Sequence, residues 1–271
     1  MRVLFIGDIL GRSGRAAVKD HLPDLKKSLK IDFVIANGEN AAAGFGITDG
    51  TAKELFTSGV DCISGGNHSF DQKTATPLME KDKRILRPIN YPKGTPGSGV
   101  GKYKDTRGRN IVVINPMGRV FMDALDDPFK AVDEALKIDG LGRTAHFIFV
   151  DIHAEATSEK MAMAQYLDGR VSCVVGTHQH IPTADAQIFP KGTAYQTDAG
   201  MCGDYNSVIG MEAEEPIRRF TTKMRRGRFT PALGEGTLCG VFVESDDKTG
   251  LAIRIEPVRL GGRLKPNLPS L

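Results

Sequence analysis

Polar side chains that can bind metal ions follow five apolar runs of the sequence. The first run is VLFIG, and the last is CVVGT. In chain order, the candidate residues are Asp8, Glu39, Asn40, Asn67, His68, His153, His178 and His180. Four of the six histidines of the chain are among them. Ligands of α/β sheets bind beyond the carboxyl ends of the strands, so we expect these side chains to converge on one crevice.

Each of these residues, taken alone, also has a structural interpretation. Asp8 can cap a helix that begins near Ser13, and Asn40 or Asn67 can occupy a tight turn. A histidine at a strand end is more often a hydrogen-bonded structural residue than a ligand. Glu39 is harder to explain in this way, because a buried carboxylate without a partner is costly.

The ligand types indicate which metals the site would take. His178 and His180 are two residues apart, and in an extended segment both imidazoles would face one metal cluster. Three histidines, two carboxylates and two amides form a mixed nitrogen and oxygen set, which suits Fe, Mn, Zn or Co rather than Ca²⁺. Seven ligands exceed the roughly four of a closed zinc site. We therefore expect two metal ions that share a bridging ligand.

The elements that must position these residues alternate between strands and helices. The five runs are almost continuously apolar, which is typical of strands buried on both faces of a partly parallel sheet. Helical spacing of apolar residues predicts helices over 13–30 and 48–58, the second with Thr48 as its N-cap. This alternation favours an α/β fold with helices covering the sheet.

Two hairpins and an irregular stretch complete the predicted organisation. Residues 86–110 are rich in Pro, Gly and basic residues, and Arg107-Gly108 is a turn signal between strand-like flanks. A polar turn separates 237–245 from 251–260, which predicts a second hairpin at the sheet edge. Because no repeat or low-complexity linker divides the chain, we expect a single domain over residues 1–271.

Composition excludes several classes of protein. Of 271 residues, 40% are hydrophobic and 25% charged, which excludes wholesale disorder, collagen and coiled coil. No apolar run approaches the roughly 18–20 residues of a membrane span, and MRVLFIGDILG turns polar too soon for a secretory signal, so we expect a cytoplasmic protein. The cysteines show no CxxC spacing and are expected to be reduced, partly buried thiols. They are Cys62, Cys173, Cys202 and Cys239.

Positive charge is concentrated in one segment. The net charge is +3, and residues 217–228 contain six positive side chains and no negative one. Such a segment can attract phosphates, so we consider a contact with RNA there. A solvated helix face or loop is the alternative interpretation.

The strand-end motifs resemble those of a known family when they are taken in order. They are GDILG at 7–11, GEN at 38–40, GGNHSFD at 65–71, DIH at 151–153 and GTHQH at 176–180. This succession resembles the calcineurin-like metallophosphoesterases. NGENAAAGFGI at 37–47 and NHSFD look like the bacterial YmdB-type branch, whose members act as cyclic-nucleotide phosphodiesterases. The resemblance covers essentially the whole chain.

Two departures from the general superfamily pattern also look like this branch. The common first motif has a histidine two residues after its aspartate, where this chain has Leu10, which cannot be a ligand. Asn40 is a plausible replacement. The common bridging aspartate is here Glu39, which is longer by one methylene. Both departures weaken a transfer of substrate preference from ordinary protein phosphatases.

The resemblance implies a layered β-sandwich of mixed sheets flanked by helices, with the site at the strand carboxyl ends. It implies that Asp8, Glu39, Asn40 and His180 hold one divalent or mixed-valence ion, with Fe or Mn as the first choices and Zn or Co as alternatives. Glu39, Asn67, His153 and His178 would hold the other. His68, outside the ligand set, is then free to act as the general acid, oriented by Asp71.

These implications favour a phosphodiesterase that hydrolyses 2′,3′-cyclic nucleotides, of the 2′,3′-cyclic AMP type, or related small phosphodiesters. A phosphomonoesterase or an RNA-processing nuclease could use the same metal core. A regulatory RNA- or protein-binding module with a structural metal site is the other class. With 13 Phe, 5 Tyr and no Trp, no aromatic motif indicates which base is bound. A homo-oligomer is expected on general grounds only.

Overall fold

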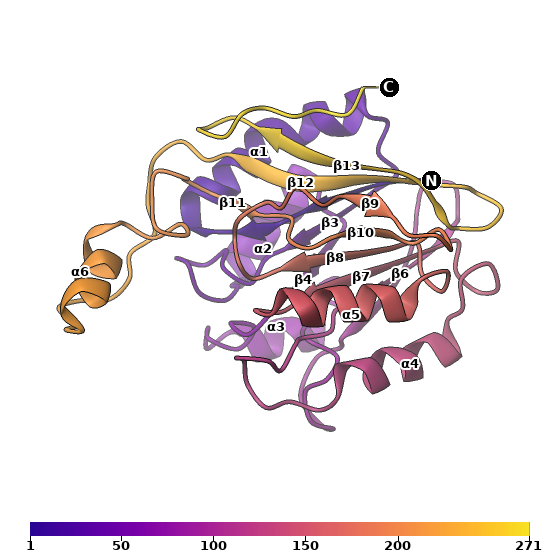
Figure 1. The fold of residues 1–271 in the computed structure, drawn as a ribbon, viewed down its shortest axis with the longest axis horizontal. Coiled ribbons are helices and arrows are strands. Elements are labelled where there is room, and N and C mark those ends of the chain that lie inside the picture. Colours follow the sequence, from indigo (N-terminus) through magenta and orange to yellow (C-terminus); the bar gives the residue numbers. More distant parts are fainter. Residues whose placement is uncertain (271) are drawn as a thin grey trace.

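Two β-sheets packed face to face form the centre of the molecule, and helices cover their outer faces (Figure 1). The computed structural model describes residues 1–270. The apolar pattern left the number of sheets open. The mixed two-sheet sandwich that the family resemblance implies is confirmed.

The first sheet has five strands. They are β1 (Arg2–Ile6), β3 (Phe33–Asn37), β4 (Cys62–Ser64), β12 (Leu238–Ser245) and β13 (Ala252–Leu260). Their order is β13-β12-β1-β3-β4. β1, β3 and β4 are parallel, whereas β12 and β13 form an antiparallel hairpin at the edge, as predicted.

The second sheet has six strands. They are β5 (Val100–Lys104), β6 (Asn110–Ile114), β7 (Phe147–His153), β8 (Cys173–Thr177), β9 (Gln187–Ile188) and β10 (Ala194–Gln196). Their order is β5-β6-β7-β8-β10-β9, with β6, β7, β8 and β10 parallel. The predicted hairpin around Arg107-Gly108 is confirmed as β5 and β6. Two short strands, β2 (Asp8–Ile9) and β11 (Met201–Cys202), pair separately.

Six helices complete the fold. They are α1 (Gly11–Ser28), α2 (Asp49–Ser58), α3 (Ala75–Lys81), α4 (Pro128–Ile138), α5 (Thr157–Leu167) and α6 (Glu214–Thr222). The helices predicted over 13–30 and 48–58 correspond to α1 and α2. Thr48 caps α2 as predicted, in a reciprocal capping box with Thr51.

Alternate residues of the central strands face different layers. In β1, Val3 and Phe5 face the second sheet, and the Phe5 ring lies 4.7 Å from the Phe149 ring, measured between centroids. Leu4 and Ile6 point the other way, into the core beneath α1 and α2. Each such burial stabilises the fold by roughly 1.5–3 kcal/mol. The continuous apolar runs therefore reflect strands that are covered on both faces.

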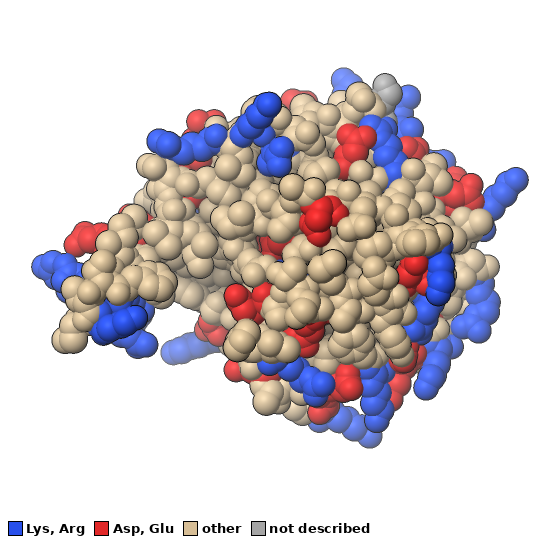
Figure 2. Space-filling model, viewed as in Figure 1, with Lys and Arg blue, Asp and Glu red and all other residues tan. Residues whose placement is uncertain are grey.

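Helix α6 projects away from the sheets (Figure 1), and basic side chains gather on this arm (Figure 2). The arm contains most of the basic segment 217–228. Arg219 contacts the Glu215 carboxylate and lies over the Phe229 ring, so this guanidinium stabilises the arm itself. The contact between this segment and RNA stays a prediction.

Two further features bear on the predictions. All four cysteines are free, and they are fully rather than partly buried. Within residues 1–270, no helix is both long and apolar enough to cross a membrane.

Candidate metal centre

The carboxyl ends of parallel strands from both sheets meet at one place. Asp8 follows β1, Glu39 and Asn40 follow β3, and the turn after β4 carries Asn67 and His68. From the second sheet, His153 ends β7, while His178 and His180 follow β8. Asp151 of β7 joins the two edges, because its carboxylate accepts hydrogen bonds from Asn37 Nδ2 at 3.0 Å and Ser64 Oγ at 2.5 Å. The structure thus brings all eight predicted residues together where the ends of the two sheets meet.

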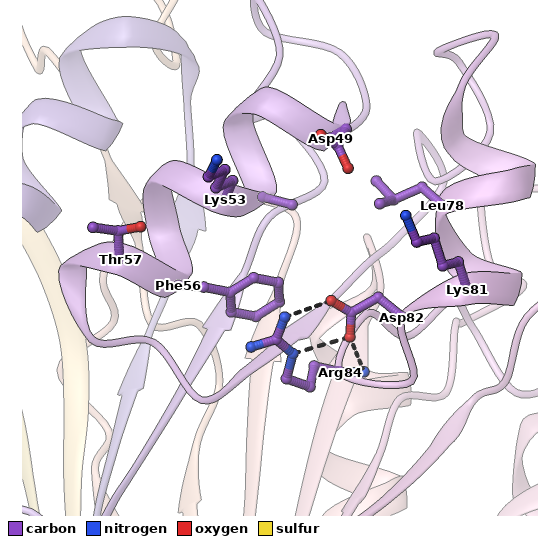
Figure 3. A pocket seen from close by; sticks show the side chains of 9 residues that line it. Asp49, Lys53, Phe56, Thr57, Leu78, Lys81, Asp82 and Arg84 are labelled. Atoms are coloured by element: carbon purple, nitrogen blue, oxygen red, sulfur yellow. Dashed lines mark hydrogen bonds and ion pairs between the residues drawn. The ribbon is translucent and has the colours of Figure 1, made fainter.

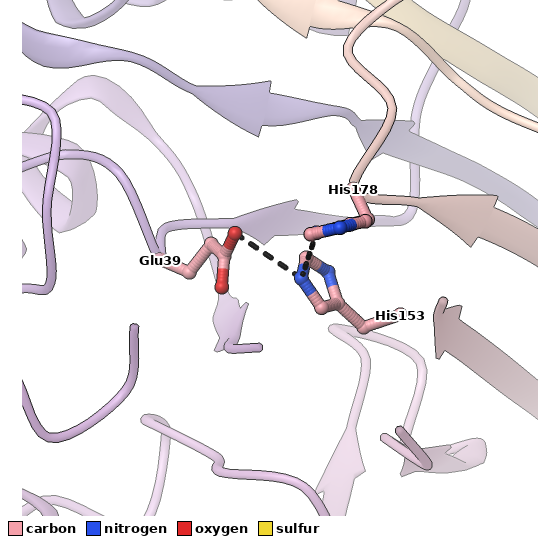
Figure 4. Close-up of side chains that lie close together, drawn as sticks. All are labelled: Glu39, His153 and His178. Atoms are coloured by element: carbon pink, nitrogen blue, oxygen red, sulfur yellow. Dashed lines mark hydrogen bonds and ion pairs between the residues drawn. The ribbon is translucent and has the colours of Figure 1, made fainter. Parts of the chain in front are cut away.

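Three lone-pair-bearing atoms surround a single nitrogen of His153. Its Nε2 lies 3.1 Å from Glu39 Oε1 and 3.1 Å from His178 Nδ1 (Figure 4). The same nitrogen lies 2.9 Å from Asn67 Oδ1. One ring nitrogen has at most one proton to donate and can satisfy only one of these atoms. This convergence of ligand atoms fits a cation placed among them.

Partners outside the centre fix the orientation of all three histidines. In each ring, one nitrogen contacts a residue outside the two ligand groups. His153 Nδ1 lies 2.9 Å from Thr177 Oγ1, and His178 Nε2 lies 3.2 Å from Glu155 Oε2. His180 Nδ1 lies 2.8 Å from the Ile209 carbonyl oxygen. Thr177 donates its own proton to Asp151 Oδ1, so its oxygen accepts from His153 Nδ1. In each ring the other nitrogen faces the centre and can bind a metal once it has lost any proton, which is the usual arrangement around metal-bound histidines.

A second group of ligand atoms consists of Asp8, Glu39 and His180. These atoms lie within 4.8 Å of one another, and Glu39 belongs to both groups. Asp8 Oδ1 and Asn40 Oδ1 are buried and have no hydrogen-bond partner among residues 1–270. The Asn40 amide is oriented by its Nδ2, which donates to the Gly44 carbonyl at 2.9 Å. A cation would satisfy both oxygens, which would otherwise be costly to bury.

The electrostatics of the crevice favour positive charge beside its carboxylates. Burial raises the pKa of Asp8 to about 7, against the opposing effect of His180 and His153. Burial would also raise the pKa of Glu39, but the adjacent His153 outweighs it, and the pKa falls to about 2. Burial would lower the pKa of His153, but Glu39 outweighs it and raises the pKa to about 9.

His68 lies at the rim of the centre, with 27% of its side chain exposed. Its backbone N–H donates to Glu39 Oε2 at 3.2 Å, and its Nδ1 lies 2.7 Å from Asp71 Oδ2. The Phe45 ring packs edge-on against the imidazole, at 5.1 Å between centroids. The predicted contact between Asp71 and His68 is therefore present, and together with Phe45 it fixes the position of the imidazole.

The expectation that residues 178–180 are extended is wrong. β8 ends at Thr177, and both histidines have a left-handed backbone, with φ of 98° for His178 and 67° for His180. Asp198 Oδ2 holds this turn by accepting the Gln179 N–H at 3.1 Å and the Lys160 ammonium at 2.8 Å. Alternation along a strand therefore does not position these rings, and each ring belongs to a different ligand group.

Sequence reasoning missed the residues that support the ligands. Thr177, Glu155 and Asp151 orient two of the histidines, while Lys160 and Asp198 hold the turn between them. One signal was available: Asp151 stands inside the apolar run FIFVDIH, where a carboxylate requires a partner. Sequence spacing gave no comparable indication for Lys160, which is fully buried.

A separate groove lies between α2 and α3 (Figure 3). It measures about 620 Å³ and contains none of the predicted site residues. Its Arg84 lies over the Phe56 ring at 3.7 Å and contacts Asp82 Oδ2 at 2.6 Å. Arg84 is therefore occupied by contacts within the groove and takes no part in the metal centre.

The chain is similar to known proteins over almost its whole length. A family model described as YmdB-like protein matches residues 4–258. The 2′,3′-cyclic-nucleotide 2′-phosphodiesterase of Bacillus subtilis (strain 168) is 48% identical over 258 residues, which cover 95% of this chain and 96% of the relative.

Two solved structures are also similar. A crystal structure of a hypothetical protein from Thermus thermophilus has a TM-score of 0.90 at 45% identity, covering 97% of this chain and 100% of that one. A crystal structure of a novel phosphatase from Mycoplasma pneumoniae has a TM-score of 0.89 at 35% identity, covering 96% and 93%.

Proposed function

The chain belongs to the YmdB-like protein family, and from this premise we propose that it is a metal-dependent phosphodiesterase acting on 2′,3′-cyclic nucleotides. It is a phosphoric ester hydrolase, like the relatives named for phosphodiesterase and phosphatase activity. The observation that carries the proposal is the pair of ligand groups that share Glu39 at the carboxyl ends of both sheets.

Two divalent ions fit the ligand atoms of the crevice. Asp8, Glu39, Asn40 and His180 would hold one ion, and Glu39, Asn67, His153 and His178 the other. When bound, such a pair supplies Lewis-acid activation of the phosphoryl group and a water-derived nucleophile at neutral pH. The nitrogen and oxygen ligands suit Fe or Mn, with Zn or Co also compatible.

His68 would act as the general acid. Asp71 contacts its Nδ1, so the carboxylate accepts the Nδ1 proton and orients the ring. Nε2 then carries the proton that passes to the leaving oxygen as the phosphorus–oxygen bond breaks. Water adds to phosphorus, one ring P–O bond of the cyclic diester is cleaved, and the product is a nucleoside monophosphate. The name of the B. subtilis relative favours cleavage at the 2′ oxygen.

The test combines elemental analysis with turnover of 2′,3′-cyclic AMP by the same sample, before and after chelation. We expect about two metal ions per chain and release of a nucleoside monophosphate that stops on chelation and returns with Mn²⁺ or Fe²⁺. A 5′ monophosphate and a short RNA serve as alternative substrates. Preferential hydrolysis of either one, or no hydrolysis of the cyclic diester by the metal-loaded protein, would contradict the proposal.

A further inference from the structure

The most exposed large apolar side chain in the described part of the chain is Phe121, at 89%. Its backbone is also unusual, because its φ of 61° lies in the left-handed region. A bulky residue there is a genuine outlier, and strained backbone clusters at functional sites. An exposed ring adds little to the stability of the fold, so neither feature is explained by packing.

The loop that carries Phe121 is attached to the metal centre. It follows β6, which ends at the same sheet edge as β7 because the two strands are parallel. At its start, the Gly118 N–H donates to the carbonyl of His153 at 2.9 Å. At its end, Met122 Sδ accepts from the Glu155 N–H at 3.3 Å. Phe121 therefore lies between two attachments to residues 153–155. This segment contains the predicted ligand His153 and also Glu155, which contacts the predicted ligand His178.

The loop is also held in a fixed shape. The largely buried Glu159 carboxylate accepts the N–H groups of Arg119 at 3.0 Å and Val120 at 3.2 Å. A Cβ at Gly118 would overlap Glu159 Oε2, so this close approach requires glycine. The Met122 N–H contacts the Arg119 carbonyl at 3.3 Å and closes a turn. Phe121 occupies the third position of that turn, where a positive φ normally selects Gly or Asn.

We propose that Phe121 is the stacking platform for the base of the bound cyclic nucleotide, an inference that rests on the proposed function. In a 2′,3′-cyclic nucleotide, one ribose carries both the base and the cyclic phosphate, so a phosphate at the metal centre places the base at its rim. Because the loop is already fixed, binding of the base loses no conformational entropy in ordering it. Stacking tolerates every base, and it favours purines because of their larger faces.

The test compares Phe121→Ala, Phe121→Gly and Phe121→Tyr with the native protein. The probes are 2′,3′-cyclic AMP, 2′,3′-cyclic CMP and glycerol 1,2-cyclic phosphate, which has the cyclic diester but no base. We expect the KM for 2′,3′-cyclic AMP to rise about 5- to 150-fold in the Ala and Gly variants. The KM for the glycerol ester should stay unchanged, and Phe121→Tyr should retain the native KM for the nucleotides.

Two controls separate stacking from a structural effect. Phe121→Gly suits the positive φ, so its Tm should equal or exceed the native value while nucleotide binding is lost. Tyr166→Ala removes an exposed ring at the far end of α5 and should leave all three KM values unchanged.

Three results would overturn the inference: equal KM increases for the glycerol ester, unchanged KM values for the nucleotides, or dissociation of a native oligomer in the Gly variant. The last result would place the ring between copies of the chain. Failure of the proposed function is distinguishable, because the metal-loaded native protein would then hydrolyse neither the nucleotides nor the glycerol ester.

Discussion

His68 differs from the seven proposed ligands in its surroundings. Its ring contacts Asp71 and Phe45 and does not enter either ligand group, and it is linked to the Glu39 carboxylate only through its backbone N–H. This arrangement suits proton transfer rather than metal binding.

Replacement of His68 by alanine should therefore lower kcat for 2′,3′-cyclic AMP by about 10²- to 10⁴-fold while leaving the metal content unchanged. The kcat of the same variant for a p-nitrophenyl phosphodiester should fall much less, because the nitrophenolate leaving group needs no proton. Steady-state kinetics and elemental analysis check this, with His21→Gln on α1 as a matched histidine control. An equal loss on both substrates would argue against an acid role.

Gly66 allows the two halves of the centre to approach each other. A Cβ at this position would overlap Glu39 Oε2 and His153 Nε2, and no positive φ is involved. We expect Gly66→Ala to reduce metal content and activity because it displaces the shared carboxylate. As a control, a Cβ at Gly50 of α2 would have no other atom within 4 Å. Gly50→Ala should therefore stabilise the protein by roughly 0.5–1 kcal/mol. A fully metal-loaded, active Gly66→Ala protein would show that the centre tolerates the overlap.

Among the elements, the turn after β8 depends most on a buried charge pair. Lys160 of α5 and Asp198 are both fully buried, 2.8 Å apart, and together they hold Gln179 between the two strained histidines. The pair thus links the outer helix to the geometry of the ligands. A turn with two positive φ values would otherwise relax toward a lower-energy backbone.

Lys160→Met should destabilise the protein by about 3–5 kcal/mol, because it leaves the Asp198 carboxylate buried and unpaired. It should also weaken metal binding. Denaturant unfolding and titration with Mn²⁺ measure both effects. Adding Asp198→Asn should recover part of the stability but not the metal affinity. Arg170→Met breaks the more exposed ion pair with Asp133 and should cost at most about 1 kcal/mol, so equal costs for the two pairs would refute this account.

At the scale of the whole molecule, the proposed metals would connect the two sheets. Asp8 and Glu39 follow β1 and β3 of the first sheet, whereas His153 ends β7 and His178 follows β8 of the second. Ions bound by these groups stabilise the folded state, because an unfolded chain does not hold the ligands together.

We therefore expect metal at about 100 times its dissociation constant to add about 2.7 kcal/mol, which raises Tm by roughly 5–10 °C. Calorimetry with a chelator and then with increasing Mn²⁺ measures the shift. His68→Ala should show the same shift as the native protein, because it leaves the ligands in place. A Tm that does not depend on metal concentration would contradict the cross-linking role.

The chemistry of the site and the class of fold could be predicted from the sequence. Buried parallel strands are apolar on both faces, so their runs and the polar residues that end them are visible in one dimension. Asp8, Glu39 and His153 could be located in this way. The contact of Asp71 with His68 lies within one turn and was likewise predictable. The single domain, the metal identity, the assembly and the cytoplasmic location stay predictions.

The tertiary structure decided what depends on contacts between distant segments. Periodicity records that a strand is buried but not which strand it pairs with, so the residue pattern by itself did not divide the strands between two sheets. It also could not assign His178 and His180 to different ligand groups, because their positive φ values are imposed by Lys160 and Asp198. Phe121 looks like an ordinary apolar residue in sequence. Only the tertiary structure shows that its loop is attached to residues 153–155 of the candidate metal centre.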